Sequence, residues 1–225
     1  MRDKVIKIFC REKHLVLYND DMQIIKPSVT LEWATPNALQ IIEKAGRTCY
    51  KSESNITDQS AESFVRKIIK SGHDSVLEHV TASFRFITDR GVTHELVRHR
   101  VASFSQESTR YCSYSKEKFG SQISIVHPDG LTEEQIIRRN ELFEKVQALY
   151  MQELNEGISP QLARGVLPTS LKTEIVCTAN FREWRHILKL RTSKAAHPQI
   201  VEVMRMVLQW FMDNYPVIVE DIRLD

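Results

Sequence analysis

Residues 98–111 read RHRVASFSQESTRY, and the rest of this 225-residue chain is organised around them. Arg98, His99 and Arg100 stand together, and a run of hydroxyl and amide side chains follows. Guanidinium groups bind phosphate and carboxylate oxygens as rigid forks, while hydroxyls and amides orient neutral polar atoms. The combination suits an anion with a polar body, such as a nucleotide. Taken alone, the triplet also fits a solvated basic corner or a chance kinase site.

The composition is that of an ordinary globular protein. The 31 Lys and Arg residues against 29 Asp and Glu residues leave a net charge of +2, too small to predict a nucleic-acid-binding surface. The 4 cysteines include no CxxC pair and predict neither a zinc knuckle nor a disulfide framework. The first residues lack the apolar core of a signal peptide, and no window reaches about 18 apolar residues. We therefore expect a cytoplasmic protein with reduced thiols and no membrane contact.

Hydrophobic periodicity predicts strands and helices along the first half of the chain. Strands are expected at residues 5–9, 14–18 and 80–88, with a turn at 19–21. Helices are expected from Thr35 as N-cap to Gly46, and from Thr57-Asp58 to Gly72. Asp89 is expected to cap a short helix over residues 90–99, on which Glu95 and Arg98 share a face.

The second half continues the mixture of strands and helices. Strands are expected at 122–126 and 171–179. Helices are expected from Thr132, in a capping box with Gln135, to Gly157; from Pro160 to Pro168; over 181–191 with Asn180 as N-cap; and from Pro198 to Tyr215. No repeat or linker interrupts the pattern, so we expect a single domain over residues 1–225.

Several polar residues admit two interpretations. His73, Glu78 and His79 suggest a metal site, but the two histidines are not spaced i,i+4 and no third ligand is near, so no metal is expected. Arg164 lies among apolar residues and needs an anionic partner, either a neighbouring helix or a ligand. Ser108 as a nucleophile would need an adjacent base, and none is apparent, so substrate binding is the favoured role.

The full string, Arg-His-Arg, seven residues and Ser108, followed by Arg110 and Tyr111, resembles the signature of the flavin-dependent thymidylate synthases. The patterns GHxSxxEH at 72–79, ARxxLP at 163–168 and TANxRxWxHxxxLR at 178–191 match as well, and the resemblance extends over about 44–200. It implies an α+β fold, with a mixed antiparallel sheet packed with helices. It also implies an enzyme that methylates dUMP to dTMP, using 5,10-methylenetetrahydrofolate as carbon donor and NADPH-reduced FAD as hydride source.

The resemblance implies roles for individual residues, in a homotetramer whose active sites are shared between subunits. FAD contacts are expected from His73, Ser75, Arg98, His99, Arg100, Gln106, Asn180, Arg182 and His186. Contacts to dUMP are expected from Glu95, Arg98, Gln106, Glu107, Ser108, Thr109, Arg110, Arg164 and Arg191. Arg191 is the expected catalytic residue, because a guanidinium beside N3–C2 stabilises the electron-rich uracil.

The chain departs from the family pattern at a few positions. Ala195 stands where members often carry histidine, with His197 two residues further on; Gln106 replaces glutamate of some members and His186 replaces asparagine. None of the cysteines matches the active-site pattern of classical thymidylate synthases. Two other functions stay open: a nucleotide- or RNA-binding regulatory module without redox activity, and a flavoprotein that has lost synthase activity.

Overall fold

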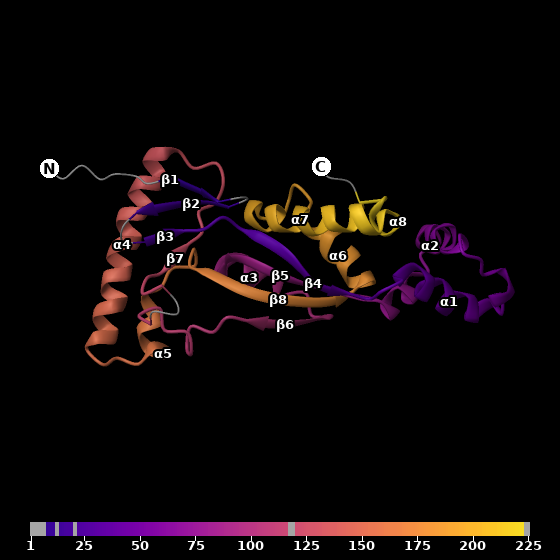
Figure 1. The fold of residues 1–225 in the computed structure, drawn as a ribbon, viewed down its shortest axis with the longest axis horizontal. Coiled ribbons are helices and arrows are strands. Elements are labelled where there is room, and N and C mark those ends of the chain that lie inside the picture. Colours follow the sequence, from indigo (N-terminus) through magenta and orange to yellow (C-terminus); the bar gives the residue numbers. More distant parts are fainter. Residues whose placement is uncertain (1–7, 12–13, 20–21, 117–119, 223–225) are drawn as a thin grey trace. The chain divides into compact units, whose positions relative to one another are not determined.

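A computed structural model of the protein describes residues 8–11, 14–19, 22–116 and 120–222, and Figure 1 shows its elements in sequence colours. The chain divides into two compact units. Unit 1 comprises Met1–Ser28, Ile87–Glu95 and Gln106–Ile175, and unit 2 comprises Val29–Phe86, Leu96–Ser105 and Val176–Asp225. Helices and strands alternate through both units, which confirms the predicted α+β class.

Unit 1 contains a small mixed sheet with the strand order β1-β2-β3-β7. Its strands are β1 (Ile8–Arg11), β2 (His14–Asn19), β3 (Met22–Ile24) and β7 (Ser124–Ile125). β1 pairs antiparallel with β2, and β2 with β3, whereas β3 and β7 are parallel. The strands predicted at 5–9 and 14–18 thus correspond to β1 and β2, while residues 5–7 and 20–21 of those predictions lie outside the described residues.

Helices complete unit 1. They are α3 (Arg90–Leu96), α4 (Glu133–Asn155), α5 (Pro160–Ala163) and the 3-10 helix η4 (Arg164–Val166). One hydrophobic core joins α4 and α5 to the sheet; its buried members are Met22, Tyr114, Ile123, Ile125, Phe143, Tyr150, Ala163 and Leu171. In Figure 1, α4 runs beside the small sheet, in agreement with that core.

A second sheet has the strand order β4-β5-β8-β6. Its strands are β4 (Ser28–Ala34), β5 (Thr81–Asp89), β6 (Ala102–Gln106) and β8 (Lys172–Asn180). The helices of unit 2 are α1 (Ala38–Tyr50), α2 (Ser60–Lys70), α6 (Phe181–Arg191), α7 (Pro198–Asn214) and α8 (Pro216–Val219), with 3-10 helices η1 (Glu53–Asn55) and η2 (Asp74–His79). Strands β3, β4 and β6 and helix α8 were not predicted.

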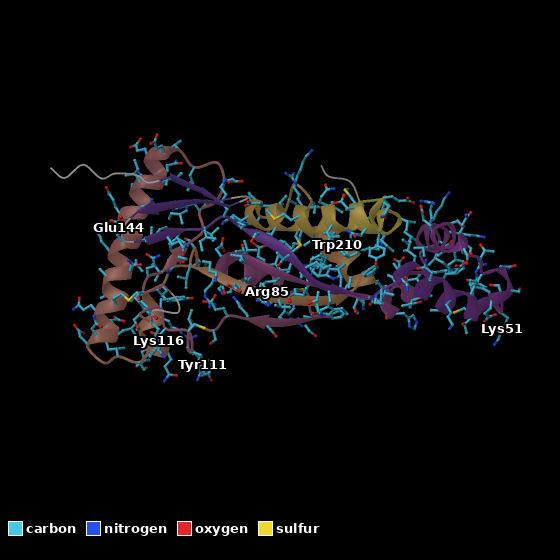
Figure 2. The ribbon with its side chains drawn as sticks, viewed as in Figure 1. Lys51, Arg85, Tyr111, Lys116, Glu144 and Trp210 are labelled. Carbon is cyan, nitrogen blue, oxygen red and sulfur yellow. The ribbon has the colours of Figure 1, made fainter. Side chains whose placement is uncertain are left out.

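Aromatic rings fill the core of unit 2. Phe84 on β5 makes edge contacts with Trp184 at 5.1 Å and Trp210 at 5.2 Å between ring centroids. Phe181 contacts Phe211 at 5.1 Å in the same geometry. These rings tie α6 and α7 to β5, and Trp210 is labelled in Figure 2. Because edge-to-face pairs add stability beyond their buried area, α6 has a fixed position on its sheet.

Local capping signals were confirmed where the cap lies next to its helix. Asp89 Oδ1 accepts a hydrogen bond from the Val92 amide at 2.8 Å, and Thr132 forms the expected capping box with Gln135. Asn180 Oδ1 accepts from the Glu183 amide at 2.8 Å. Each cap satisfies an amide that the first turn of a helix leaves without a partner.

Several predicted helix boundaries were wrong, among them the start at Thr35 and the end at residue 99. Thr35 does not cap α1, because its hydroxyl bonds Thr81 across 46 residues of sequence, and the helix starts at Ala38 after Asn37 as N-cap. The helix expected over 90–99 ends at Leu96, since the His99 amide donates to the Leu96 carbonyl in a turn. Arg98 is therefore outside α3 and does not share a helical face with Glu95.

Gly46, predicted as the end of the first helix, lies inside α1. A Cβ atom at this position would lie 2.7 Å from ring atoms of Phe64 on α2. The Phe64 ring is also covered by the Arg47 guanidinium, 4.5 Å from its centroid. Glycine is present here because two helices approach closely, and not because the helix stops.

Candidate functional site

The Arg98–Arg100 triplet forms the turn between α3 and β6. His99 is buried, whereas Arg98 and Arg100 on either side of it are exposed. Neighbouring residues of an extended or turning chain point in opposite directions, so the alternation follows from the backbone. The triplet therefore presents two cations outwards and one imidazole inwards, within unit 2.

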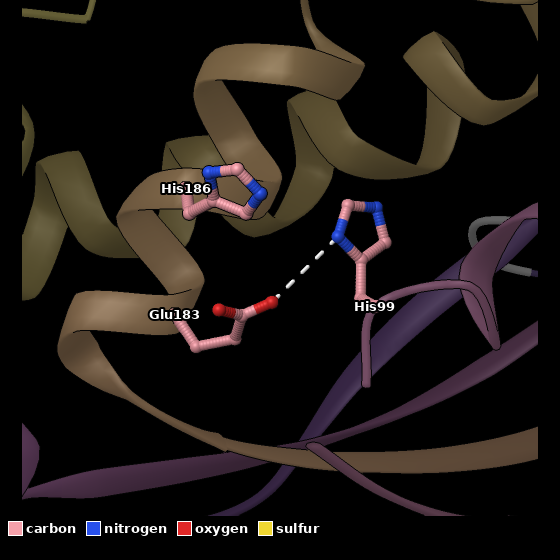
Figure 3. A group of neighbouring side chains, drawn as sticks. All are labelled: His99, Glu183 and His186. Carbon is pink, nitrogen blue, oxygen red and sulfur yellow. Dashed lines mark ion pairs between the residues drawn. The ribbon is translucent and has the colours of Figure 1, made fainter. Parts of the chain in front are cut away.

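His99 lies in a group of four side chains that we call the His99 cluster: His99, Glu183, His186 and Arg191. Figure 3 shows the first three of them. The Arg191 Nε donates to His99 Nε2 at 3.0 Å. On the other edge of the ring, His99 Nδ1 lies 3.7 Å from Glu183 Oε1. The His186 ring meets the His99 ring edge-on, with 5.9 Å between centroids.

Burial controls the protonation of this cluster. The pKa of His99 is lowered to about 4, first by desolvation and then by the charges of Arg191 and His186. His99 is therefore neutral at pH 7. Burial also raises the pKa of Glu183, an effect that His186 partly opposes.

The orientation of α6 about its own axis brings these side chains together. Glu183 and His186 are three residues apart and so share one helical face, which Figure 3 shows turned towards His99. Trp184 Nε1 donates to the Ala82 carbonyl at 3.0 Å on β5. Arg185, also buried, forms a two-pronged ion pair with Asp221, with N–O distances of 2.7 and 2.9 Å. These contacts fix the rotation of α6.

A separate cavity of about 380 Å³ lies in unit 2, among α1, α2, η2 and the start of α6. Its lining residues are Gly46, Cys49, Tyr50, Ile68, Gly72, His73, Asp74, Ser75, Val76 and Arg182. The cavity thus brings together three of the predicted FAD contacts: His73, Ser75 and Arg182. The Tyr50 hydroxyl lies 3.2 Å from His73 Nδ1.

The donor set of this cavity fits a phosphorylated cofactor. Arg182 is half exposed and pairs with Glu78, with its Nη1 2.5 Å from the carboxylate. Ser75 and His73 are exposed beside it, and guanidinium, imidazole and hydroxyl groups all bind phosphate oxygens. Asp74 Oδ1 is buried and has no hydrogen-bond partner among the described residues, so an acceptor for a ligand hydroxyl is also present.

One predicted substrate residue of unit 1, Glu107, lies in a second group, which we call the Glu107 cluster: Arg90, Glu107, Tyr114, Lys172 and Glu174. Glu107 Oε1 accepts from the Tyr114 hydroxyl at 2.8 Å, and Glu107 Oε2 from Lys172 Nζ at 3.2 Å. Arg90 Nη2 donates to the Glu107 carbonyl at 2.8 Å. Lys172 also pairs with Glu174. The Glu107 side chain is therefore held within unit 1.

The residues next to Glu107 are fixed in the same way. Gln106 Nε2 donates to the hydroxyls of Thr93 at 2.9 Å and Thr173 at 3.3 Å. Ser108 Oγ accepts from the Arg110 amide at 3.3 Å. The segment after β6 thus has a defined shape.

Arg164 differs from its expected environment. Its apolar neighbours in the sequence suggested burial, with an anionic partner from a neighbouring helix or a ligand. It is exposed, and Nη1 donates to Thr109 Oγ1 at 3.3 Å, so a ligand as the anionic partner stays a prediction. The surrounding apolar residues did not indicate burial, because the short α5–η4 segment leaves Arg164 and Leu162 at the surface. The proximity to Thr109 does bring two predicted dUMP contacts together.

Sequence reasoning missed three residues that organise these groups. Glu183 was not predicted as a site residue, although its i,i+3 spacing to His186 is present in the sequence. Tyr114 and Lys172 had no sequence signal, because their hydrogen bonds to Glu107 form only when unit 1 folds.

Among the described residues, no helix is both long enough and apolar enough to cross a membrane.

Comparison with known proteins identifies the family of this chain. The family model for thymidylate synthase complementing protein matches residues 30–217. Flavin-dependent thymidylate synthase of Mycobacterium tuberculosis is 35% identical over 190 residues, covering 75% of this chain and 72% of that protein. Flavin-dependent thymidylate synthase of Pyrococcus furiosus is 33% identical over 189 residues, covering 82% and 74%.

A solved structure shows the same fold. The UMP/dUMP methylase PolB from Streptomyces cacaoi, bound with 5-Br dUMP, superimposes with a TM-score of 0.75 at 24% identity, covering 89% of this chain and 95% of that chain. The family match spans residues from both units, including the whole 98–111 stretch. This chain therefore belongs to the thymidylate synthase complementing protein family, which includes the flavin-dependent thymidylate synthases.

Proposed function

We propose that this chain is a flavin-dependent thymidylate synthase, which methylates dUMP to dTMP. The observation that carries the proposal is the 33–35% identity to flavin-dependent thymidylate synthases over most of the chain. The cofactor is FAD, and NADPH and 5,10-methylenetetrahydrofolate are the co-substrates of this family. FAD supplies the hydride chemistry when it is bound, and the protein supplies binding and orientation.

The unit 2 cavity supports a role in holding FAD. Its cationic and hydroxyl donors, Arg182, His73 and Ser75, suit the phosphates, and Asp74 offers an acceptor for ribose or adenine donors. We propose that Arg98, His99, Arg100, Gln106, Asn180 and His186 complete the FAD site. The buried position of His99 favours contact through its ring edge or backbone.

The dUMP site in this proposal combines cations and polar groups. Arg110 and Arg164 are exposed guanidinium groups next to the 106–110 segment, suited to the phosphate. Arg191 stabilises negative charge that develops on the uracil ring. Glu95, Arg98, Gln106, Ser108 and Thr109 complete the substrate set. Glu107, whose carboxylate is bound by Tyr114 and Lys172, contributes by shaping this segment.

Assembly and location are part of the same proposal. We propose that residues 1–225 act as a single catalytic domain, in a cytoplasmic homotetramer whose active sites are shared between subunits. The many exposed apolar side chains, among them Trp33, Val101 and Leu162, are compatible with burial in such an assembly.

The test is the visible absorption spectrum of the purified protein, followed under anaerobic conditions. We expect flavin bands that bleach with NADPH at a rate that dUMP changes. Addition of dUMP and methylenetetrahydrofolate should then yield dTMP, measured by chromatography. A colourless protein that takes up no added FAD would overturn the proposal in favour of a binding module without redox activity.

A further inference from the structure

The hydrogen bond between Arg191 and His99 defines a tautomer. An arginine Nε always donates, so His99 Nε2 at 3.0 Å must carry a lone pair. Because the depressed pKa keeps the ring neutral, its single proton resides on Nδ1. The partner of one ring nitrogen thus sets the chemical state of the other.

Glu183 is the carboxylate that faces this proton. Its Oε1 lies 3.7 Å from His99 Nδ1, and both side chains are shielded from water, with 5% of His99 and 12% of Glu183 exposed. At that distance the interaction is electrostatic and not a direct hydrogen bond. In a partly buried site, a carboxylate still favours the tautomer that points its N–H towards it.

We propose that Glu183 is a positioning residue for the proposed synthase reaction. Its carboxylate keeps the His99 proton on Nδ1, which leaves Nε2 as the acceptor that holds the Arg191 guanidinium in place. Glu183 acts through His99 and Arg191 and does not itself touch the reacting atoms. The proposal rests on the proposed function only for the catalytic role of Arg191; the tautomer is a property of the protein alone.

The other ionisable groups near His99 are consistent with a neutral imidazole whose proton is on Nδ1. Burial lowers the pKa of His99 most, and the charges of Arg191 and of His186 on α6 lower it further, so the ring stays neutral. Cys177 on β8 has its pKa raised to about 12, by burial and then by the charge of Glu183, so it stays an uncharged thiol. Among the groups described as acting on His99, the Glu183 carboxylate is the one that attracts the Nδ1 proton.

A divalent cation would be the competing explanation for this cluster. Ligand atoms of His99, Glu183 and His186 all lie within 4.8 Å of one another, and two imidazoles with a carboxylate suit zinc. Metal binding at Nδ1 would move the ring proton to Nε2, where it would point at the Arg191 Nε–H. The two arrangements exclude each other, and the observed hydrogen bond favours the cation-free one.

Solution NMR of protein labelled with 15N-histidine tests the tautomer directly, with His99→Gln to assign the His99 signals. We expect the wild-type ring at pH 7 to be neutral with Nδ1 protonated. Glu183→Ala should transfer a measurable fraction of the proton to Nε2, and Glu183→Gln, which retains an acceptor oxygen, should transfer less. An unchanged His99 tautomer in Glu183→Ala would overturn the proposal. This readout needs neither FAD nor turnover, so it is separate from failure of the proposed function.

Kinetics test the consequence for Arg191. Glu183→Ala should lower kcat for dTMP formation on the order of tenfold to a hundredfold, as expected when a catalytic group is misplaced. Glu183→Gln should recover part of that loss, which a purely structural defect would not show. If Glu183→Ala is insoluble, the Gln variant alone decides, and wild-type kcat together with a wild-type tautomer would overturn the proposal.

A matched control and a metal arm complete the experiment. Glu62 on α2 is an exposed glutamate that pairs with Arg66, and Glu62→Gln should leave kcat and the His99 tautomer unchanged. The wild-type protein and Glu183→Ala are each titrated with Zn²⁺ alone. We expect no stoichiometric zinc binding in the wild type that is lost in the variant. Such binding, with loss of the Nδ1–H signal, would overturn the proposal in favour of a metal site.

Discussion

The Glu107 cluster is built around the buried Tyr114 and the His99 cluster around the buried His99, but burial has opposite consequences in them. In the Glu107 cluster each carboxylate oxygen has its own donor, Tyr114 on one and Lys172 on the other. The Tyr114 pKa is raised, by burial and then by the Glu107 charge, so its hydroxyl stays a donor. In the His99 cluster the carboxylate lies 3.7 Å from the imidazole, and burial pushes both groups towards their neutral forms.

This difference implies that the Glu107 cluster stabilises the fold, whereas the protonation of the His99 cluster can change with its surroundings. A fully bonded ion pair makes the folded state depend on each member, because removal of one leaves the others without partners. A group kept neutral by desolvation responds instead to small changes in charge or pH. We therefore expect changes in the Glu107 cluster to affect stability first, and changes in the His99 cluster to affect activity and pH dependence first.

The largest effect is expected from Arg191→Ala. Loss of its guanidinium should lower dTMP formation by roughly 10²–10³-fold, the cost of removing one group that stabilises developing charge. FAD content and the urea midpoint should stay near wild type. The control is Arg205→Ala on the exposed side of α7, expected to keep full activity. Near-normal turnover of Arg191→Ala with FAD bound would contradict the expectation that changes in the His99 cluster affect activity first.

The second prediction concerns the pH dependence of stability. The folded pKa of His99, about 4, lies below the usual 6.5, so the unfolded chain takes up the proton first as pH falls. His99 thus contributes stability that is complete above pH 6.5 and is lost on the way to about pH 4, by up to roughly 3 kcal/mol.

Urea unfolding at several pH values measures this effect. His99→Gln should flatten the slope between pH 4 and 6.5. His127 should contribute a further part of that slope, because burial lowers its pKa as well, and His127→Gln serves as the comparison variant. An identical slope in wild type and His99→Gln would mean that burial does not control this cluster.

Glu107→Ala comes third and probes the other cluster. The change leaves Lys172 and Tyr114 without their shared acceptor, so we expect a loss of about 2 kcal/mol in the free energy of unfolding. Urea denaturation measures it, and Glu174→Gln, which removes only the more exposed partner of Lys172, should cost under about 1 kcal/mol. Equal losses in the two variants would contradict the central place of Glu107.

The smallest expected effect is that of Tyr114→Phe. It removes one hydrogen bond to Glu107 and leaves the ring in the core of unit 1. The expected loss is about 1 kcal/mol, with kcat unchanged, because Lys172 still holds the carboxylate. A fall in kcat without a fall in stability would contradict the expectation that the Glu107 cluster affects stability first and the His99 cluster affects activity first.

Features encoded over a few residues were predictable from the sequence. Asp89, Thr132 and Asn180 cap the helices that directly follow them, and their partners are three residues away. The strand over 81–89 follows from its alternating apolar side chains. Features that depend on distant partners were not predictable: Thr35 bonds Thr81 instead of capping a helix, and short strands such as β3 are defined by their neighbours.

In the candidate site, too, the sequence predicted which residues take part but not the contacts between distant residues. The motif located His99, Gln106 and Arg191 in the sequence, but not that His99 is buried against Arg191 and Glu183. That arrangement depends on α6 and the 98–100 turn meeting in space. Arg164 is exposed, so the apolar residues beside it in the sequence did not predict its burial, and a ligand as its anionic partner stays a prediction.

Gly46 has a consequence for the variation that this protein tolerates. Any side chain there meets the Phe64 ring at 2.7 Å, and the same residue lines the cavity proposed for FAD. Helix packing and cavity shape therefore depend on a single missing methyl group. A library randomised at position 46 and selected for growth without thymidine should return glycine, with alanine surviving only beside a smaller residue at position 64.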